Sequence, residues 1–171
     1  SRSVKVSDFY DLVKAHPDIF GDVSPTPSIS GTVKVGTTTY SNTSTKGVSE
    51  SYLEMSGYKI SVGRGINYVD LTDNKKVCVV GAYLNRVAYG GNAGGQIIGS
   101  EKYTIVGVLE AKVTDLSNQE GSGDDIVLVP YTTALRVSGT STSGSYAVVV
   151  PDESKLSEGK TILEEGLQEL L

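Results

Sequence analysis

Acidic side chains are the residues of this sequence best suited by type and spacing to do chemistry. Asp124 and Asp125 are adjacent, and Glu120 and Asp115 precede them in the polar segment Thr114–Asp125. Two carboxylates can act as general acid and base in a hydrolase, but hydrolases hold them on rigid supports at a set separation. The glycines and serines of this segment favour a solvent-exposed loop. Weak calcium binding is a less favoured alternative, because the acidic spacing fits no EF-hand.

The single histidine and the single cysteine offer little to a catalytic or metal site. His16 stands at the predicted end of a short helix before Pro17, where a cation interacts favourably with the helix dipole. Cys78 lies in the apolar run Val77–Val80, which favours a buried and inert thiol, since reactive thiols need exposure and nearby positive charge. One histidine and one cysteine are too few ligands for a Cys/His zinc site.

The glycine-rich segment 90–95 has some of the composition of a phosphate-binding loop. Such loops directly follow a strand, carry Lys followed by Ser or Thr, and open a helix, and this segment does none of these. We therefore expect a turn. The ten tyrosines are spread along the chain and are expected to be mostly half-buried core, with a few lining a sugar or peptide surface. We expect no catalytic, cofactor-binding or metal-binding residue, and the sequence does not name the residues that bind a partner.

The charge balance argues against two classes of partner. The net charge is −5 and the isoelectric point is near 4.9. A nucleic-acid surface would be basic, and adhesion to anionic lipid also needs clustered positive charge. The hydrophobic content of 38% is that of a globular domain. No apolar run approaches the roughly 20 residues of a membrane helix, and no signal peptide is visible.

The elements that must position these side chains centre on Lys76–Leu109. Val77–Val80 is a short β-branched run stopped by glycine, which predicts a strand buried on both faces. The alternation of 32–35 and 37–41 around Gly36 predicts a hairpin. A helix is predicted over 83–88, ended by Gly90 and Gly91 and followed by strands at 97–98 and 103–109, and a later short helix is expected to end at Gly139. Because strands and helices do not alternate regularly, the pattern favours an α+β fold over a doubly wound sheet.

The chain ends with a predicted amphipathic helix that starts near Ser154. Its leucines form a narrow apolar stripe that needs a packing partner, and they are Leu156, Leu163, Leu167 and Leu170. The strand near Val4 to Val6 is a candidate partner. Gly159 and Gly166 lie inside the helix and weaken it by about 1 kcal/mol each relative to alanine.

An ordered set of segments resembles a known family. VCVVGAYLNRVAYG, QIIG and YTIVGVLEA occupy the centre, SYLEMSGYKISVGRGINYVD precedes them, and VSDFYDLVKAHPDIFGDVSP and DDIVLVPYTTALRVSG lie near the two ends. In this order they resemble the MacB-type periplasmic core domain, the extracytoplasmic domain of ABC transporter permeases of the MacB, LolC and FtsX superfamily. The resemblance covers nearly the whole chain. It implies two lobes, a discontinuous Porter-like lobe over 1–56 and 124–171 and an inserted Sabre-like lobe over 57–123.

The resemblance also implies a non-catalytic function. Such a domain lies outside the cell membrane, on the periplasmic or cell-surface side, and transmits movement driven by cytoplasmic ATP hydrolysis to a substrate or partner. It implies a nucleotide-binding ATPase subunit or domain, a permease dimer, and a periplasmic adaptor or lipoprotein partner. Membrane helices would precede Ser1 and follow Leu171, so both ends would lie on one face.

Two other functions stay open from the sequence. One is a secreted or surface-anchored module that binds glycan or peptide. The other, less favoured, is a hydrolase that uses Asp124 and Asp125. The substrate, the oligomeric state and the cell-envelope type are not readable from the sequence, because they depend on surface loops that apolar patterning does not describe.

Overall fold

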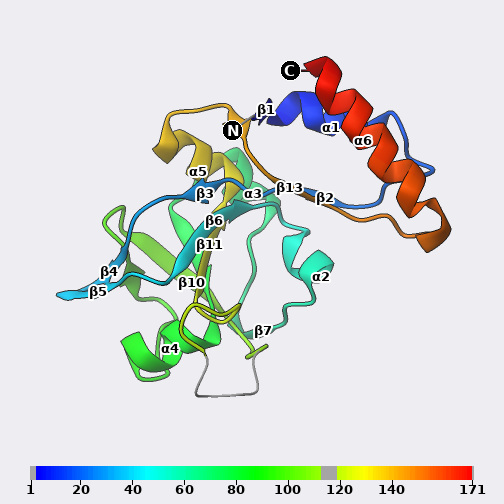
Figure 1. Ribbon diagram of the computed structural model, residues 1–171. Helices are drawn as coiled ribbons and strands as arrows, with labels where there is room; N and C mark the ends of the chain where they lie inside the picture. Colours follow the sequence, from blue (N-terminus) through cyan, green and yellow to red (C-terminus); the bar gives the residue numbers. More distant parts are fainter. Residues whose placement is uncertain (1–2, 113–118, 171) are drawn as a thin grey trace.

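The computed structural model describes residues 3–112 and 119–170 (Figure 1). The strands are β1 (Val4–Lys5), β2 (Val23–Pro25), β3 (Ser28–Ile29), β4 (Val33–Val35), β5 (Thr38–Tyr40), β6 (Ser44–Val48), β7 (Ile60–Gly63), β8 (Val77–Val80), β9 (Ile97–Ile98), β10 (Tyr103–Leu109), β11 (Ile126–Pro130), β12 (Thr142–Ser143) and β13 (Tyr146–Val148). The helices are α1 (Val6–Lys14), α2 (Tyr52–Ser56), α3 (Tyr68–Thr72), α4 (Ala82–Tyr89), α5 (Tyr131–Ser138) and α6 (Leu156–Leu170), with a 3-10 turn, η2 (Glu153–Lys155).

Within the described ranges, seven strands form one mixed sheet at the centre of the molecule. Its order is β3-β6-β11-β8-β10-β7, with β9 paired to β10. The pairs β6–β11 and β8–β10 are parallel, and the other neighbours are antiparallel. A mixed sheet with helices in irregular order confirms the predicted α+β class.

The central strands bury side chains on both faces, as predicted for Val77–Val80. Cys78 and Val80 of β8 point into one hydrophobic cluster together with Leu84 of α4. Val79 points into the opposite cluster, which also contains Leu71 of α3. Because successive side chains of a strand alternate between faces, a run of apolar residues needs a core on each side, and the sheet supplies both.

Both predicted lobes contribute strands to this sheet. β3, β6 and β11 come from the part assigned to the Porter-like lobe, and β7, β8 and β10 come from the insert. The two parts meet where β11 pairs with β8, with Val127 opposite Val80 and Leu128 opposite Val79. The lobe boundaries near residues 57 and 124 stay a prediction.

The two ends of the chain form a third cluster beside the sheet. Figure 1 shows α1 and α6 side by side, connected to the central body through β2 and β13. Short antiparallel pairs, β1 with β12 and β2 with β13, tie the N-terminal segment to the C-terminal one. None of the helices in the described part of the chain is both long and apolar enough to cross a membrane.

Several local predictions are confirmed. β4 and β5 form the expected hairpin around Gly36. Gly90 and Gly139 end α4 and α5 in the left-handed conformation that favours glycine. Helix α3 was not predicted, although Asn67 and Asp70 form a capping box at its start.

Candidate functional site

The carboxylate pair is buried, which contradicts the expected solvent-exposed loop. Asp124 is 0% and Asp125 is 1% exposed. Asp125 accepts hydrogen bonds from the Thr43 hydroxyl at 2.6 Å and from the Gly121 N–H at 2.8 Å. Asp115, the more distant member of the predicted acidic group, lies outside the described residues, and Glu120 accepts a hydrogen bond from Asn42.

Asp124 holds the chain in the same region. Its carboxylate accepts the N–H of Lys112 at 2.8 Å, and its carbonyl oxygen accepts the N–H of Tyr83 at 3.1 Å. Polar composition misled the sequence interpretation, because Ser, Gly and Asp suit a tight, hydrogen-bonded turn as well as a solvated loop. These hydrogen bonds fix the segment that leads into β11, so the arrangement is suited to holding the fold.

The other candidates for chemistry occupy structural positions in the fold. Cys78 is fully buried, which confirms its predicted burial, and burial raises the pKa of its thiol, as expected for an unreactive one. His16 lies just past α1 and packs edge-on against the Phe20 ring. The glycine-rich segment forms the predicted turn, in which the N–H of Ala93 donates to the Asn85 side chain. Among residues 3–112 and 119–170, no group of three His, Cys, Asp or Glu side chains is placed to hold a metal ion.

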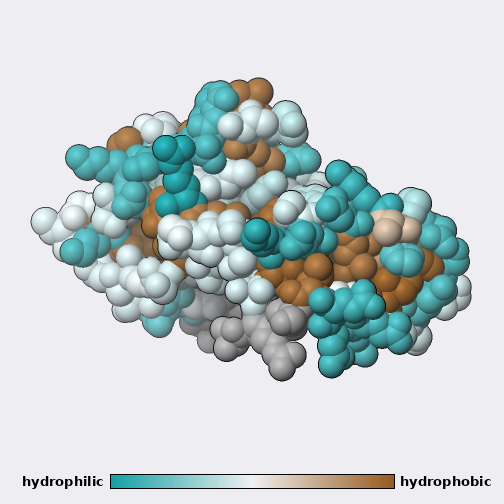
Figure 2. Space-filling model, turned by 90° about the horizontal axis from the view of Figure 1, so that it is seen from above, coloured by the Kyte–Doolittle hydropathy of each residue, from teal (hydrophilic) through white to brown (hydrophobic). Residues whose placement is uncertain are grey.

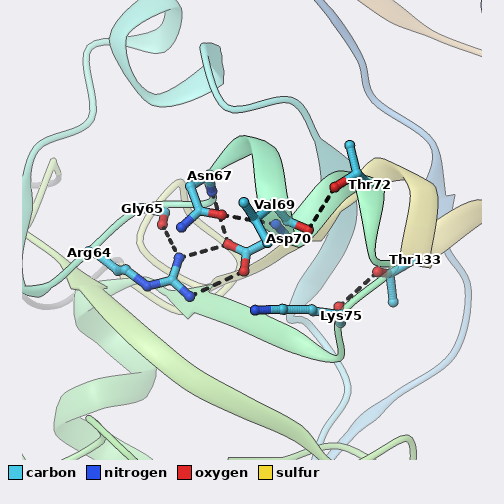
Figure 3. Close-up of polar contacts among 8 residues, drawn as sticks. All are labelled: Arg64, Gly65, Asn67, Val69, Asp70, Thr72, Lys75 and Thr133. Carbon is cyan, nitrogen blue, oxygen red and sulfur yellow. Dashed lines mark hydrogen bonds and ion pairs between the residues drawn. The ribbon is translucent and has the colours of Figure 1, made fainter.

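An ion pair with a buried carboxylate, at the start of α3, was missed from the sequence (Figure 3). Asp70 is 0% exposed, and its two carboxylate oxygens accept hydrogen bonds from Arg64 at 2.7 and 3.2 Å. The Asn67 N–H donates to the same carboxylate at 2.9 Å, and the Asn67 side chain accepts the Asp70 N–H. The spacing Asn-x-x-Asp is the signal that identifies such a helix start.

The environment of Asp70 favours its charged form. Burial alone would raise the pKa of this carboxyl, but the hydrogen bonds from Arg64 and Asn67 and the nearby positive charges outweigh it and hold the pKa below its usual value. Arg64 is 43% exposed at its side chain, so the pair opens to solvent on the arginine side. Arg64 also donates to the Gly65 carbonyl at 3.0 Å, so the pair fixes the start of α3 against the chain that leaves β7.

The feature with the clearest mechanical consequence is the packing of the two chain ends. We call it the chain-end cluster, and it consists of Val4, Phe9, Val13, Ile19, Phe20, Val23, Tyr146, Val148, Val150, Ile162, Leu163 and Leu167. Leu163 and Leu167 of the predicted leucine stripe join Val4 of β1 in this cluster, and the helix itself contacts α1. The two leucines are half-buried, and Leu156 and Leu170 are exposed.

Two glycines bring α6 close to its partners. A methyl group at Gly166 would lie 2.6 Å from a terminal carbon of Leu12 in α1. One at Gly159 would lie 3.3 Å from Ile19, Phe20 and Val150. The glycines that weaken α6 by propensity thus permit its close packing.

A groove opens in the chain-end cluster. It has a volume of about 450 Å³ and lies between α6 and β13; Val4 and Phe9 line it, and Lys160 is its charged lining residue among those described. Seen from above, apolar surface is exposed on the part of the molecule that carries α1 and α6 (Figure 2). Apolar surface of this kind is typical of a contact region.

Comparison with known proteins identifies relatives along the whole chain. A family model described as MacB-like periplasmic core domain matches residues 2–164. The macrolide export ATP-binding/permease protein MacB of Aggregatibacter actinomycetemcomitans is 27% identical over 99% of this chain and 26% of its own length. The protein of the same description from Chlorobium luteolum is 29% identical over 96% of this chain and 24% of its own length. The chain thus spans about a quarter of these curated relatives.

Solved structures show the same fold. The periplasmic region of MacB from Actinobacillus actinomycetemcomitans superposes with a TM-score of 0.82 at 23% identity, over 99% of this chain and 75% of that one. The extracellular domain of the noncanonic ABC-type transporter YknZ from Gram-positive bacteria superposes with a TM-score of 0.76 at 17% identity, over 98% and 82%. At these identities the likeness is one of fold.

Proposed function

The chain belongs to the family of MacB-like periplasmic core domains, and from this premise we propose that it transmits ATP-driven movement across a membrane to a substrate or partner outside it. The observation that carries the proposal is the family match over residues 2–164. In this role the domain is non-catalytic and lies on the extracytoplasmic side of a permease. The ATPase, the second permease and an adaptor or lipoprotein are its proposed partners.

The chain-end cluster supports this role physically. A movement delivered to one end of the chain can reach the rest of the domain only through contacts that hold their geometry. Val4 and Leu163 share one cluster, and α1 packs against α6, so a displacement of either end also displaces the other. The proposed face for the membrane helices is therefore the one formed by β1 and α6.

The central sheet supports the proposed transmission of movement from the chain ends to the rest of the domain. β13 pairs with β2, and β2 contacts β6 of the sheet, which connects the chain ends to the central body. Within the sheet, β11 pairs with β8, so the part assigned to the Sabre-like insert is hydrogen-bonded to the Porter-like part. A hydrogen-bonded sheet is a stiff joint, as the transmission of movement requires.

The proposal is tested in a full-length permease that contains this domain. Leu163→Ala with Leu167→Ala loosens α6 against α1, and we expect ATP hydrolysis to continue while export or extraction is lost. The matched control, Glu164→Ala with Glu165→Ala, changes exposed residues of the same helix and should leave both activities intact. Normal transport by the leucine variant would contradict the transmission role.

The location is tested separately. Cys78 is the only cysteine and is buried, so a cysteine introduced at exposed Glu164 provides one reactive thiol. A membrane-impermeant maleimide should label it in intact cells or spheroplasts. Labelling only after lysis would contradict the extracytoplasmic position, and a labelled protein released free into the medium would favour the secreted binding module.

A further inference from the structure

The groove in the chain-end cluster is a trough between two regular walls. One wall is a face of α6, because its lining residues recur at helical spacing; they are Leu156, Gly159, Lys160, Leu163 and Leu167. The other wall consists of alternate residues of β13 and the chain that follows it, which point to one side of the strand; they are Tyr146, Val148 and Val150. Val4, Phe9 and residues 143–145 complete the lining.

The groove is already formed in the structure. The Tyr146 ring stacks on the Phe9 ring and its hydroxyl donates to the Val4 carbonyl at 2.7 Å, so this wall has a fixed position. At the other wall, Gly159 lets α6 approach Val150 closely. Ligand sites in proteins are usually preformed hollows of this kind, lined mainly by apolar and aromatic side chains.

Much of the apolar lining is in contact with water. Leu156 is 44% exposed. The half-buried lining residues of the two walls are Tyr146, Val148, Val150, Leu163 and Leu167. A ligand that covers these side chains gains the free energy of removing them from water. The groove is therefore suited to an apolar occupant.

The dimensions of the groove select the shape of that occupant. From Leu156 to Leu167 the helix advances about 16 Å, at roughly 1.5 Å per residue. A volume of about 450 Å³ over that length corresponds to a cross-section of about 30 Å². An α-helix about 10 Å across needs about 80 Å². A strand with its side chains, about 4.8 by 10 Å in a stacked sheet, needs about 50 Å². Either would rest on the rims, whereas a single hydrocarbon chain can lie inside.

The charge at the groove selects the head group. Among the described residues, Lys160 is the one charged side chain that lines the groove, and neither Asp nor Glu lines it. Lys160 is exposed, and a lysine can lay its apolar stem along such a surface while its ammonium stays in water at the rim. The whole chain carries a net charge of −5, so this local cation, and not the overall charge, must attract an anion.

We propose that the groove binds one acyl chain with its anionic head group beside Lys160, and that the ligand is a free fatty-acid anion. One water molecule occupies about 30 Å³ in the liquid and a methylene group is similar in size, so the groove takes a chain of about 15 carbons. This site goes beyond the proposed transmission of movement, and its binding is measured on the 171-residue chain without transport.

A series of fatty acids of increasing length tests the fit. Calorimetric titrations use octanoate, decanoate, laurate, myristate, palmitate and stearate, each below its micelle concentration. The affinity should rise about two- to fourfold for each added methylene and should level off at myristate or palmitate, where the groove is full. A steady rise through stearate, or no binding of any of them, would overturn the proposal.

Two substitutions at matched positions locate the site. Leu156→Asp places a carboxylate in the groove and should lower the affinity for myristate about tenfold or more, because the acyl chain would desolvate a charge. Leu170→Asp is the control, since Leu170 lies on the same helix, is 43% exposed and does not line the groove. Circular dichroism checks that both variants are folded. Equal affinities of the two variants would place the fatty acid elsewhere on the protein and refute the assignment.

The head group is tested without changing an apolar residue. Lys160→Gln should bind myristate about two- to fivefold more weakly, as expected for an exposed ion pair. Lys34→Gln, at an exposed position of β4, should bind it as the wild type does. The wild type should also bind laurate more tightly than dodecylamine.

Two results would contradict the proposed ligand. One is tighter binding of the amine, which would remove the role of Lys160. The other is a concentration-dependent dimer of the wild-type chain that Leu156→Asp disrupts, measured by sedimentation, because the groove would then be an interface between two copies of the chain.

Discussion

The rings of Phe9 and Tyr146 are stacked, with their centroids 3.8 Å apart and their planes at 5°. The Tyr146 hydroxyl also donates a hydrogen bond to the Val4 carbonyl at 2.7 Å. This contact joins the first helix to the last strand, so the two chain ends form one packed unit. The proposed transmission of movement depends on that unit.

Truncating the buried ring should weaken the unit strongly. Phe9 is 2% exposed. Phe9→Ala should lower the free energy of unfolding by about 3–5 kcal/mol, because it removes a buried aromatic side chain and leaves a cavity. The measurement is urea unfolding followed by circular dichroism. Val69→Ala, at a position that is 50% exposed, is the control and should change the free energy by less than about 0.5 kcal/mol. Equal effects would show that Phe9 is not part of a core.

The close approach of α6 to α1 can be tested at Gly166. Leucine favours a helix over glycine by about 0.8 kcal/mol, so propensity alone predicts that Gly166→Leu is stabilising. Because the new side chain would meet Leu12, we expect the variant instead to lose about 1–3 kcal/mol. Gln168→Leu changes an exposed position of the same helix and should have little effect. Thermal unfolding of both variants measures the difference, and a more stable Gly166→Leu protein would refute the packing.

Asp125 should behave as a structural residue. Asp125→Ala leaves the Thr43 hydroxyl and the Gly121 N–H without their acceptor, so we expect a loss of about 1.5–3 kcal/mol. Asp18→Ala, at an exposed position, is the control. Chemical denaturation gives both values. A loss below about 0.5 kcal/mol for Asp125→Ala would restore the exposed loop that the sequence suggested.

The Asp70 ion pair should make stability depend on acid. Its pKa is lowered in the folded protein, so its contribution is complete above the unfolded pKa of about 3.9 and is lost as the pH falls through the lower folded value. The difference in unfolding free energy between the wild type and Asp70→Asn should therefore stay constant from about pH 5 to about pH 7. It should shrink below about pH 4. Denaturation curves across this range measure it. A gap that widens in acid would contradict the direction of the shift.

Local sequence patterns predicted most of the strands and helices but not which strands pair with each other in the sheet. The run Val77–Val80 and the alternation around Gly36 depend on short-range rules, and both are confirmed. The pairing of β11 with β8 is set by contacts across the fold, which no local window contains. The sequence therefore indicated strands buried on both faces without indicating that the two predicted lobes share a sheet.

The site residues were harder to predict, because a polar residue that suggests a solvent-exposed loop can instead be buried and hydrogen-bonded. Asp125 and the residues around it have the composition of a solvated loop. Hydrogen bonds from Thr43 and Gly121 nevertheless offset the free-energy cost of burying its carboxylate. Gly166 was read by helix propensity as a weakness, whereas its role is set by Leu12 on another helix. Asp70 was predictable, since Asn67 three residues earlier completes a capping box.

The distance between the chain ends tests the transmission role most directly. Nitroxide labels at Ser3→Cys and Glu169→Cys, both exposed, can be measured by pulsed electron spin resonance, while buried Cys78 stays unlabelled. Since Val4 and Leu167 pack in one cluster, we predict one distance well under the ~50 Å expected for ends at opposite poles of an elongated domain. A distance near that length would contradict a shared face and the transmission of movement through it.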